Sequence, residues 1–295
     1  MPGASSERMQ EARVFLEEIS GNPPRLPYDP SLLPKLFAAS GEGSNITLDE
    51  LTALVERSPN LAASVLSTAN AALYALESTV SSLHRAVSIL GLKELRNQVI
   101  RDSASALVRN AKFPASFDAA GASQHQVLTA ELAKALAKTL QGMGCALRID
   151  PDEAYAAGLL HDIGKVLLAA RRPQVWSAVE ESREAGKLSF AEAEDEYWGI
   201  DHALVGAQVL HYWQLPLMLT DTINWHHAPQ LAPSYAAEAR LIAAADLLAN
   251  EGLNPDGTLP QGAAELLPEN ADYAVLAEAA RAAEAKARSV TGAGG

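Results

Sequence analysis

The segment "DPDEAYAAGLLHDIGKVLLAA", residues 150–170, sets a histidine and an aspartate side by side in a stretch that is otherwise small and apolar. It opens as helices do, with an aspartate cap, a proline in the first turn and two further acids. We expect one helix that carries the whole segment. Burying His161 and Asp162 is unfavourable unless each is paired or binds a cation. A hydrogen-bonded or surface pair and a metal site both remain open at this point.

The composition favours an all-α protein. Hydrophobic residues make up 48% of the 295 residues, whereas aromatic residues make up only 5%. Alanine and leucine supply most of the apolar content, and both are good helix formers. No segment alternates convincingly between apolar and polar residues, as a half-buried strand would.

Charge and cysteine content narrow the possible partners and location. The net charge of 23 − 36 = −13 argues against a nucleic-acid partner, because binding to the phosphate backbone relies on Lys and Arg. The single cysteine, Cys145, excludes an internal disulfide and fits a reducing compartment. No run of roughly 20 apolar residues predicts a membrane span, and the N-terminus does not resemble a secretory signal. We therefore expect a cytoplasmic protein with no membrane partner; its oligomeric state stays open.

Helix signals and chain breaks predict a two-lobe helical bundle. The motif "TLDE", residues 47–50, is a capping box, and Gly91 is a plausible helix end. Pro114 and Gly121 break the chain between the lobes. The predicted parts are an N-terminal extension (1–24), an N-terminal helical lobe (25–115), a lobe with the candidate metal site (116–250), and a C-terminal helix with a flexible tail (251–295).

Further imidazole and carboxylate groups come from apolar surroundings in the second lobe. Convergence of such groups from several helices is how a bundle builds a metal site. The candidate metal ligands are His125, His161, Asp162, His202, His226, His227 and Asp246. Imidazole and carboxylate ligands suit Fe or Mn, which we expect first, and also Zn, Co or Ni.

Five histidines and two aspartates are too many for one ion. They predict two transition-metal ions with Asp162 shared between them, and such a pair can activate water and bind a phosphoryl oxygen. Lys165 follows His161 by one helical turn and is the candidate phosphate contact. A solvated helix lysine is an equally good interpretation of Lys165. Asp162 and Lys165 are the candidate catalytic residues.

The order His125, His161-Asp162, His202, His226-His227, Asp246 resembles that of the HD superfamily of metal-dependent phosphohydrolases, and especially its HD-GYP branch. The segments "LVERSPNLAASVLSTANAALY" and "SSLHRAVSILGLKELRNQVI" resemble the N-terminal part of the HDOD domain, the HD-related output domain of bacterial signalling proteins. "GIDHALVGAQVLHYWQLP" and "INWHHAP" continue that resemblance, which spans about residues 25–250.

The resemblance implies an all-helical bacterial signalling output domain with metal-ligand roles for those seven residues and a phosphate contact for Lys165. Two departures concern the HD-GYP branch. The segment after His227, "APQLAPSYAAEAR", lacks a Gly-Tyr-Pro tripeptide, and Gly121 stands where that branch often has a glutamate for a third ion. Hydrolysis of a cyclic dinucleotide is therefore not expected, and two ions are favoured over three.

Two functions follow from these observations. One is a regulatory module that uses a metal site to bind a phosphate-bearing small ligand or a signalling protein partner. The other is a metal-dependent phosphohydrolase or phosphodiesterase acting on a nucleotide. The sequence favours the module modestly, because the family is known mostly for regulation.

Overall fold

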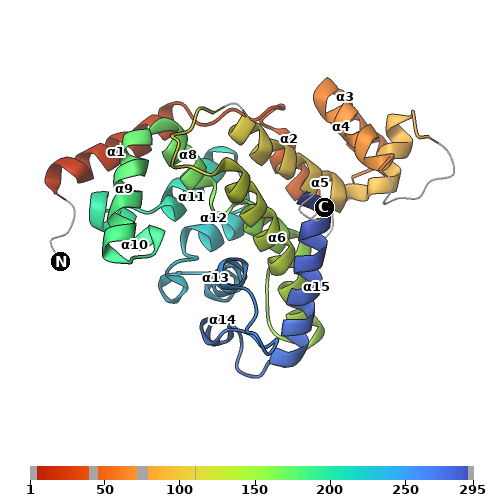
Figure 1. The fold of residues 1–295 in the computed structure, drawn as a ribbon. Coiled ribbons are helices and arrows are strands. Elements are labelled where there is room, and N and C mark those ends of the chain that lie inside the picture. The colour runs from red at the N-terminus through yellow and green to blue at the C-terminus, as the bar shows by residue number, and fades with distance from the viewer. Residues whose placement is uncertain (1–4, 40–45, 72–78, 110, 292–295) are drawn as a thin grey trace. The chain divides into compact units, whose positions relative to one another are not determined.

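The computed structural model describes residues 5–39, 46–71, 79–109 and 111–291 (Figure 1). The all-α prediction is confirmed, because these residues form helices and none of them lies in a strand. None of the helices in these ranges is long and apolar enough to cross a membrane. The chain divides into two compact units, and each is described by itself: the first comprises residues 1–24, 107–212 and 217–295, and the second residues 25–106 and 213–216.

The described residues of the second unit form α2 (Leu32–Ala39), α3 (Leu48–Glu56), α4 (Pro59–Ala69) and most of α5 (Leu83–Arg109). The predicted capping box at the start of α3 is present, with Thr47 and Glu50 each bonding the backbone of the other. Gly91, the expected helix end, has φ 70° and interrupts α5 with a kink. Asp102 on α5 accepts hydrogen bonds from Tyr28 at 2.7 Å and from Ser64 at 2.8 Å.

The first unit contains the remaining helices: α1 (Ser6–Gly21), α6 (Ala119–Gly142), α7 (Pro151–Leu160), α8 (Ile163–Arg171), α9 (Pro173–Gly186), α10 (Phe190–Trp198), α11 (His202–Tyr212), α12 (Leu217–Asn224), α13 (Ala236–Glu251), α14 (Gln261–Leu266) and α15 (Tyr273–Thr291), with a short 3-10 helix at Pro229–Leu231. Helix α6 is the central helix of this unit, because α7, α13 and α15 all pack against it. Figure 1 shows α15, in blue, running beside α6.

The expectation of one helix through residues 150–170 is wrong. The chain leaves α7 after Leu160 and re-enters helix at Ile163, so His161 and Asp162 occupy the junction between α7 and α8. Asp162 has φ −99° and ψ 13°, outside the helical range. Apolar side chains continue on both sides of the junction, which is why the periodicity gave no sign of a break. The junction points two consecutive polar side chains into the core.

A close backbone approach fixes the position of this junction. A Cβ atom placed on Gly164 would lie 2.0 Å from the carbonyl oxygen of His202 and 2.8 Å from its carbonyl carbon. Only a residue without a side chain allows α8 to lie this close to the start of α11. Gly164 therefore brings the His161-Asp162 pair within reach of His202.

We predict that Gly164→Ala destabilises the protein by about 1–3 kcal/mol, because the added methyl group meets backbone rather than a flexible side chain. Denaturant unfolding of both variants would measure this. The matched control is Gly142→Ala at the last residue of α6, where an added Cβ meets nothing within 4 Å. Equal stability of the two variants would contradict the proposed role of the contact.

Candidate metal centre

The structure brings all seven predicted ligand residues to one place in the first unit. His125 lies on α6, His161 and Asp162 at the α7–α8 junction, and His202 at the first position of α11. The other three follow from later elements: His226 and His227 lie in the turn after α12, and Asp246 lies on α13. The remaining two histidines stay outside: His84 lies on α5, and His211 is exposed near the end of α11.

Three of the donors form the Asp246 group, which consists of His125, His161 and Asp246. One ligand atom from each lies within 4.8 Å of the others. The Oδ1 atom of Asp246 is 3.0 Å from Nε2 of His125 and 3.4 Å from Nε2 of His161. The side-chain amide of Asn250, one turn further along α13, donates to the same oxygen at 3.0 Å and orients it.

Three other donors form the His227 group, which consists of His202, His226 and His227. Their ligand atoms also lie within 4.8 Å of one another. The Nε2 atoms of His202 and His227 are only 2.8 Å apart. His202 and His226 are fully buried, whereas His227 is exposed, so the group reaches from the interior of the unit to its surface.

Asp162 lies between the two groups. Its Oδ1 atom is 3.0 Å from Nε2 of His202 and 3.4 Å from Nε2 of His161, and its Oδ2 atom is 3.7 Å from Nε2 of His125. This carboxylate therefore reaches members of both groups. That is the position expected of a bridging ligand.

Backbone carbonyls orient two of the rings. His161 directs Nδ1 to the carbonyl oxygen of Gly158 at 2.7 Å, and His226 directs Nδ1 to that of Ile223 at 2.6 Å. A carbonyl oxygen only accepts, so in each ring Nδ1 carries the proton and Nε2 keeps its lone pair. Both lone pairs then face the centre, the arrangement that metal-binding histidines use.

Glu194 orients a third ring and was missed by the sequence reasoning. Its side chain is fully buried on α10, and one oxygen accepts from Nδ1 of His202 at 2.6 Å and from the backbone N–H of His202 at 2.9 Å. One carboxylate oxygen therefore orients the His202 ring and also accepts from the first backbone N–H of α11. The sequence signal is an acid within "AEAEDEYW", where the neighbouring acids Glu192 and Asp195 are exposed.

The donor set fits a pair of transition-metal ions. Nε2 of His226 is buried and has no hydrogen-bond partner, which is unfavourable for a ring nitrogen. Nε2 atoms also face each other at 3.2 Å between His125 and His161, where at most one of the two can donate. Cations placed among these nitrogens and the two carboxylates would satisfy every one of these atoms.

The carboxylates of the centre stay ionised. Burial raises the pKa of Asp162, but the facing His161, Lys165 and His202 outweigh burial and hold it well below its usual range. Burial likewise raises the pKa of Asp246, and hydrogen bonds from His125 and His161 bring it well below the ordinary value. Both aspartates are therefore in the form that binds metal.

The histidines of the His227 group differ in protonation. Burial lowers the pKa of His226 to about 3, and it also holds the pKa of His227 well below its ordinary value. Burial lowers the pKa of His202 too, but the Glu194 carboxylate outweighs it and raises that pKa to about 9. Without metal, His202 is the protonated member of the group at neutral pH.

Lys165 points its ammonium group at the centre. Its Nζ atom lies 2.8 Å from Oδ2 of Asp162. Burial lowers the pKa of Lys165, but Asp162 and Asp246 together raise it, so the side chain stays cationic. Of the two sequence interpretations, the structure therefore places Lys165 beside the ligand set and not in bulk solvent.

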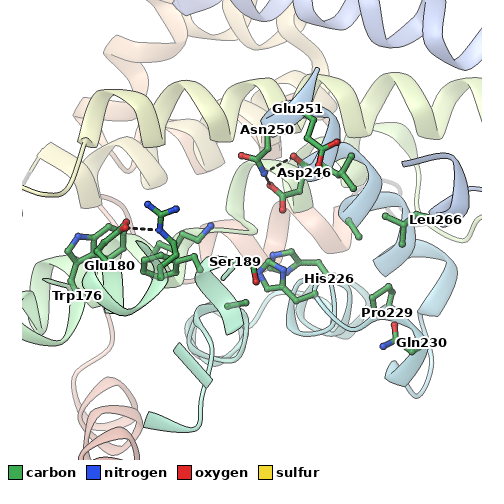
Figure 2. Close-up of a pocket in the computed structure, with 17 residues that line it drawn as sticks. Trp176, Glu180, Ser189, His226, Pro229, Gln230, Asp246, Asn250, Glu251 and Leu266 are labelled. Carbon is green, nitrogen blue, oxygen red and sulfur yellow. Dashed lines mark hydrogen bonds and ion pairs between the residues drawn. The ribbon is translucent and has the colours of Figure 1, made fainter. Parts of the chain in front are cut away.

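A cavity of about 660 Å³, here called the His227 cavity, opens onto the centre. His226, His227, Asp246 and Lys165 all line it. Figure 2 shows Asp246 and His226 between Trp176 and Glu180 toward one end of the cavity and Pro229 and Gln230 toward the other. The volume is in the range of small-molecule sites.

Comparison with known proteins identifies the family and the fold. The sequence model of the HDOD domain matches residues 26–229. The chain belongs to the HDOD family. This HDOD protein is 25% identical over 209 residues to a protein of Treponema pallidum (strain Nichols) called "Uncharacterized protein". The match covers 70% of this chain but only 39% of that relative, so the chain spans well under half of the relative's length.

Solved structures show the same fold. An HDOD domain protein of unknown function from Geobacter sulfurreducens superposes with a TM-score of 0.72 at 24% identity, covering 96% of this chain and 98% of that one. A protein of Shewanella amazonensis SB2B named "Putative phosphohydrolase" gives a TM-score of 0.70 at 24% identity, covering 94% and 97%. At these identities the likeness concerns the fold alone.

We predict that the protein, purified without chelator, holds about two transition-metal ions per chain. Asp162→Ala should lower this to about one or fewer, because Asp162 reaches both groups. It should also lower the melting temperature measured with metal present, since a ligand at about 100 times its Kd adds about 2.7 kcal/mol of stability. Elemental analysis and thermal unfolding measure the two effects. His211→Ala, a histidine outside the centre, is the control and should keep both ions.

The affinity for Mn²⁺ should rise as pH increases from 6 toward 9. His202 binds a metal only after losing the proton on Nε2, and its raised pKa of about 9 keeps that proton in place at lower pH. Binding at pH 8 should therefore release about one proton from His202. Calorimetric titration in two buffers of different ionisation enthalpy measures the release. Glu194→Gln keeps an acceptor but removes the charge, so proton release should fall; a release that is unchanged in this variant would disprove the role assigned to Glu194.

Proposed function

We propose that this HDOD protein is a metal-dependent phosphohydrolase that acts on a phosphate-bearing small molecule. The observation that carries the proposal is a complete set of five imidazoles and two carboxylates that lies beside a cation and opens onto a cavity of about 660 Å³. A purely structural metal site is usually closed to ligands, whereas a catalytic site keeps an open position. The protein from Shewanella amazonensis SB2B that has the same fold carries the name "Putative phosphohydrolase".

The seven residues would hold two transition-metal ions, for which Fe and Mn remain the first expectation. When bound, such ions make water nucleophilic at neutral pH and offset the negative charge of a phosphoryl group. The chain's own residues do the rest. Asp162 holds the two ligand groups together, and Asn250 and Glu194 fix the orientation of Asp246 and His202.

Lys165 supplies positive charge where a phosphate would lie. Its Nζ atom faces the centre from α8 and also lies 5.5 Å from the centre of the Phe190 ring. A preorganised cation stabilises the charge on the non-bridging oxygens without having to move during the reaction. The nearby aromatic wall keeps water away from that charge and so strengthens the interaction.

We place this activity in bacterial signal transduction, as the family resemblance implies, and in the cytoplasm, as the sequence led us to expect, with a phosphate-bearing small ligand as the partner. The regulatory module stays the competing hypothesis: there the site binds such a ligand, or a signalling protein, without hydrolysis. The open cavity with Lys165 at its wall favours a site that takes a phosphate-bearing ligand over a site that only binds metal, and turnover separates hydrolysis from binding alone.

A panel of phosphomonoesters and phosphodiesters, assayed with Mn, Fe, Co or Zn, tests the proposal. We expect metal-dependent turnover that disappears in His161→Ala. Lys165→Ala should keep the metal content and reduce turnover by roughly 10²–10³-fold, as loss of one oxyanion donor does. Lys138→Ala, an exposed lysine on α6, is the matched control and should keep full activity.

The absence of turnover across the panel, in protein shown by elemental analysis to hold both ions, would refute the hydrolase and leave the regulatory module.

A further inference from the structure

Three adjoining cavities are lined by different candidate metal ligands. The His227 cavity contains His226, His227 and Asp246. A central cavity of about 310 Å³ contains His125 and Asp162, and a third cavity of about 610 Å³, the His125 cavity, has His125 as its only candidate ligand in the described chain. The candidate centre therefore has space on both of its sides.

Shared walls join the three spaces. Lys165, Trp176 and Asn250 line both the His227 cavity and the central cavity. Gly121 and His125 line both the central cavity and the His125 cavity. Asp162 and Lys165 thus stand at the middle of one trough, and a large cavity extends from each end of it.

With metal bound, the charges in the trough favour a single phosphate at its middle. Of the other carboxylates that line the central cavity, Glu180 pairs with Arg183, and Asp118 accepts from backbone N–H groups at the start of α6. Lys165 stands beside the ligand set, whereas the arginines of the flanking cavities pair with carboxylates. Arg183 in the His227 cavity lies 2.7 Å from Glu180, and Arg288 in the His125 cavity lies 3.8 Å from Glu284. A polyphosphate tail in either cavity would meet charges that are already balanced. Polar or aromatic groups without charge fit these cavities better.

The side chains that line the two flanking cavities differ, and the difference indicates which organic group of a ligand each cavity would hold. Phe190 lines the His227 cavity as a half-buried ring that packs 4.7 Å from the nearly buried ring of Trp176, and an aromatic face held in this way suits a planar ring such as a nucleobase. The His125 cavity combines apolar Leu128 and Leu248 with the polar side chain of Gln124. The His125 cavity can hold a second organic group, and its lining does not require that group to be planar.

We infer that the ligand is a phosphodiester, with its phosphate at Asp162 and Lys165 and an organic group in each flanking cavity. This rests on the proposed function and narrows it to phosphodiester hydrolysis. Water forms the new P–O bond, one ester P–O bond breaks, and the leaving oxygen takes a proton from that water. The products are a phosphomonoester and an alcohol. A monoester would use only one of the two cavities.

Helix α13 provides a matched pair of variants to test this. Ala243 and Ala249 lie one turn before and one turn after Asp246, and both are half-buried. Ala243 lines the His227 cavity and Ala249 lines the His125 cavity. Replacing either with leucine adds the same volume on the same helix and removes no ligand. Elemental analysis and thermal unfolding check that both variants keep their metal and their fold.

Binding and turnover are measured separately, with Mn²⁺ bound. The binding probes are a dinucleoside phosphorothioate (a diester) and a nucleoside 5′-phosphorothioate (a monoester); the turnover probes are bis(p-nitrophenyl) phosphate and p-nitrophenyl phosphate. We expect the wild type to bind the diester at least about tenfold more tightly, the effect of one well-filled subsite. Ala249→Leu should weaken diester binding by about the same factor and spare the monoester. Ala243→Leu should weaken both.

Each result decides one question. Diester binding no tighter than monoester binding, or equal losses for both probes in Ala249→Leu, would overturn the inference. Turnover of the monoester alone would overturn it too and leave the hydrolase standing. Tighter binding of the diester that depends on Ala249, without turnover of either substrate, would support the phosphodiester as ligand and refute the hydrolase.

Discussion

The burial of four imidazole and carboxylate groups in the core of a helical unit, beside three further ligand groups that are less buried, is the constraint on which the rest of the structure depends. His161, His202 and His226 are each exposed by 1% or less, and Asp162 by only 6%. Removing such groups from water is unfavourable unless they are paired or bound to a cation. The surrounding helices meet this cost with hydrogen bonds to fixed acceptors and with opposite charges placed a few ångströms apart.

Close helix packing makes those fixed contacts possible. Gly164 lets α8 approach the start of α11, and Gly158 allows a similar approach of α7 to α6, since a Cβ there would lie 2.8 Å from Cα of Ala130. The first contact carries His202 toward Asp162, and the second carries His161 toward His125. Small residues on helix faces thus set the distances between ligand side chains, and the chemistry of the site follows from those distances.

The buried pair of Glu194 and His202 shows how far the centre extends beyond its direct ligands. The carboxylate holds the His202 ring in place and raises its pKa. In the metal-free protein, Nε2 of His202 therefore carries a proton that metal binding must displace. Helix α10, which carries Glu194, also packs against α1, where Phe15 stacks on Trp198 at 5.5 Å. The N-terminal helix therefore supports the element that orients one ligand.

The sequence by itself determined the helical class, the capping signals and the identity of the seven candidate ligands. These depend on local composition and on polar residues in apolar surroundings, which a single chain displays directly. Tertiary structure alone decided the break between α7 and α8, the roles of Glu194 and Asn250, and the cavities on both sides of Asp162. Apolar residues flank His161 and Asp162 on both sides at helical spacing, and Glu194 looks like any other acid of an acidic helix. What distinguishes them is contact with residues distant in sequence, such as Gly164 with His202, and only packing creates that contact.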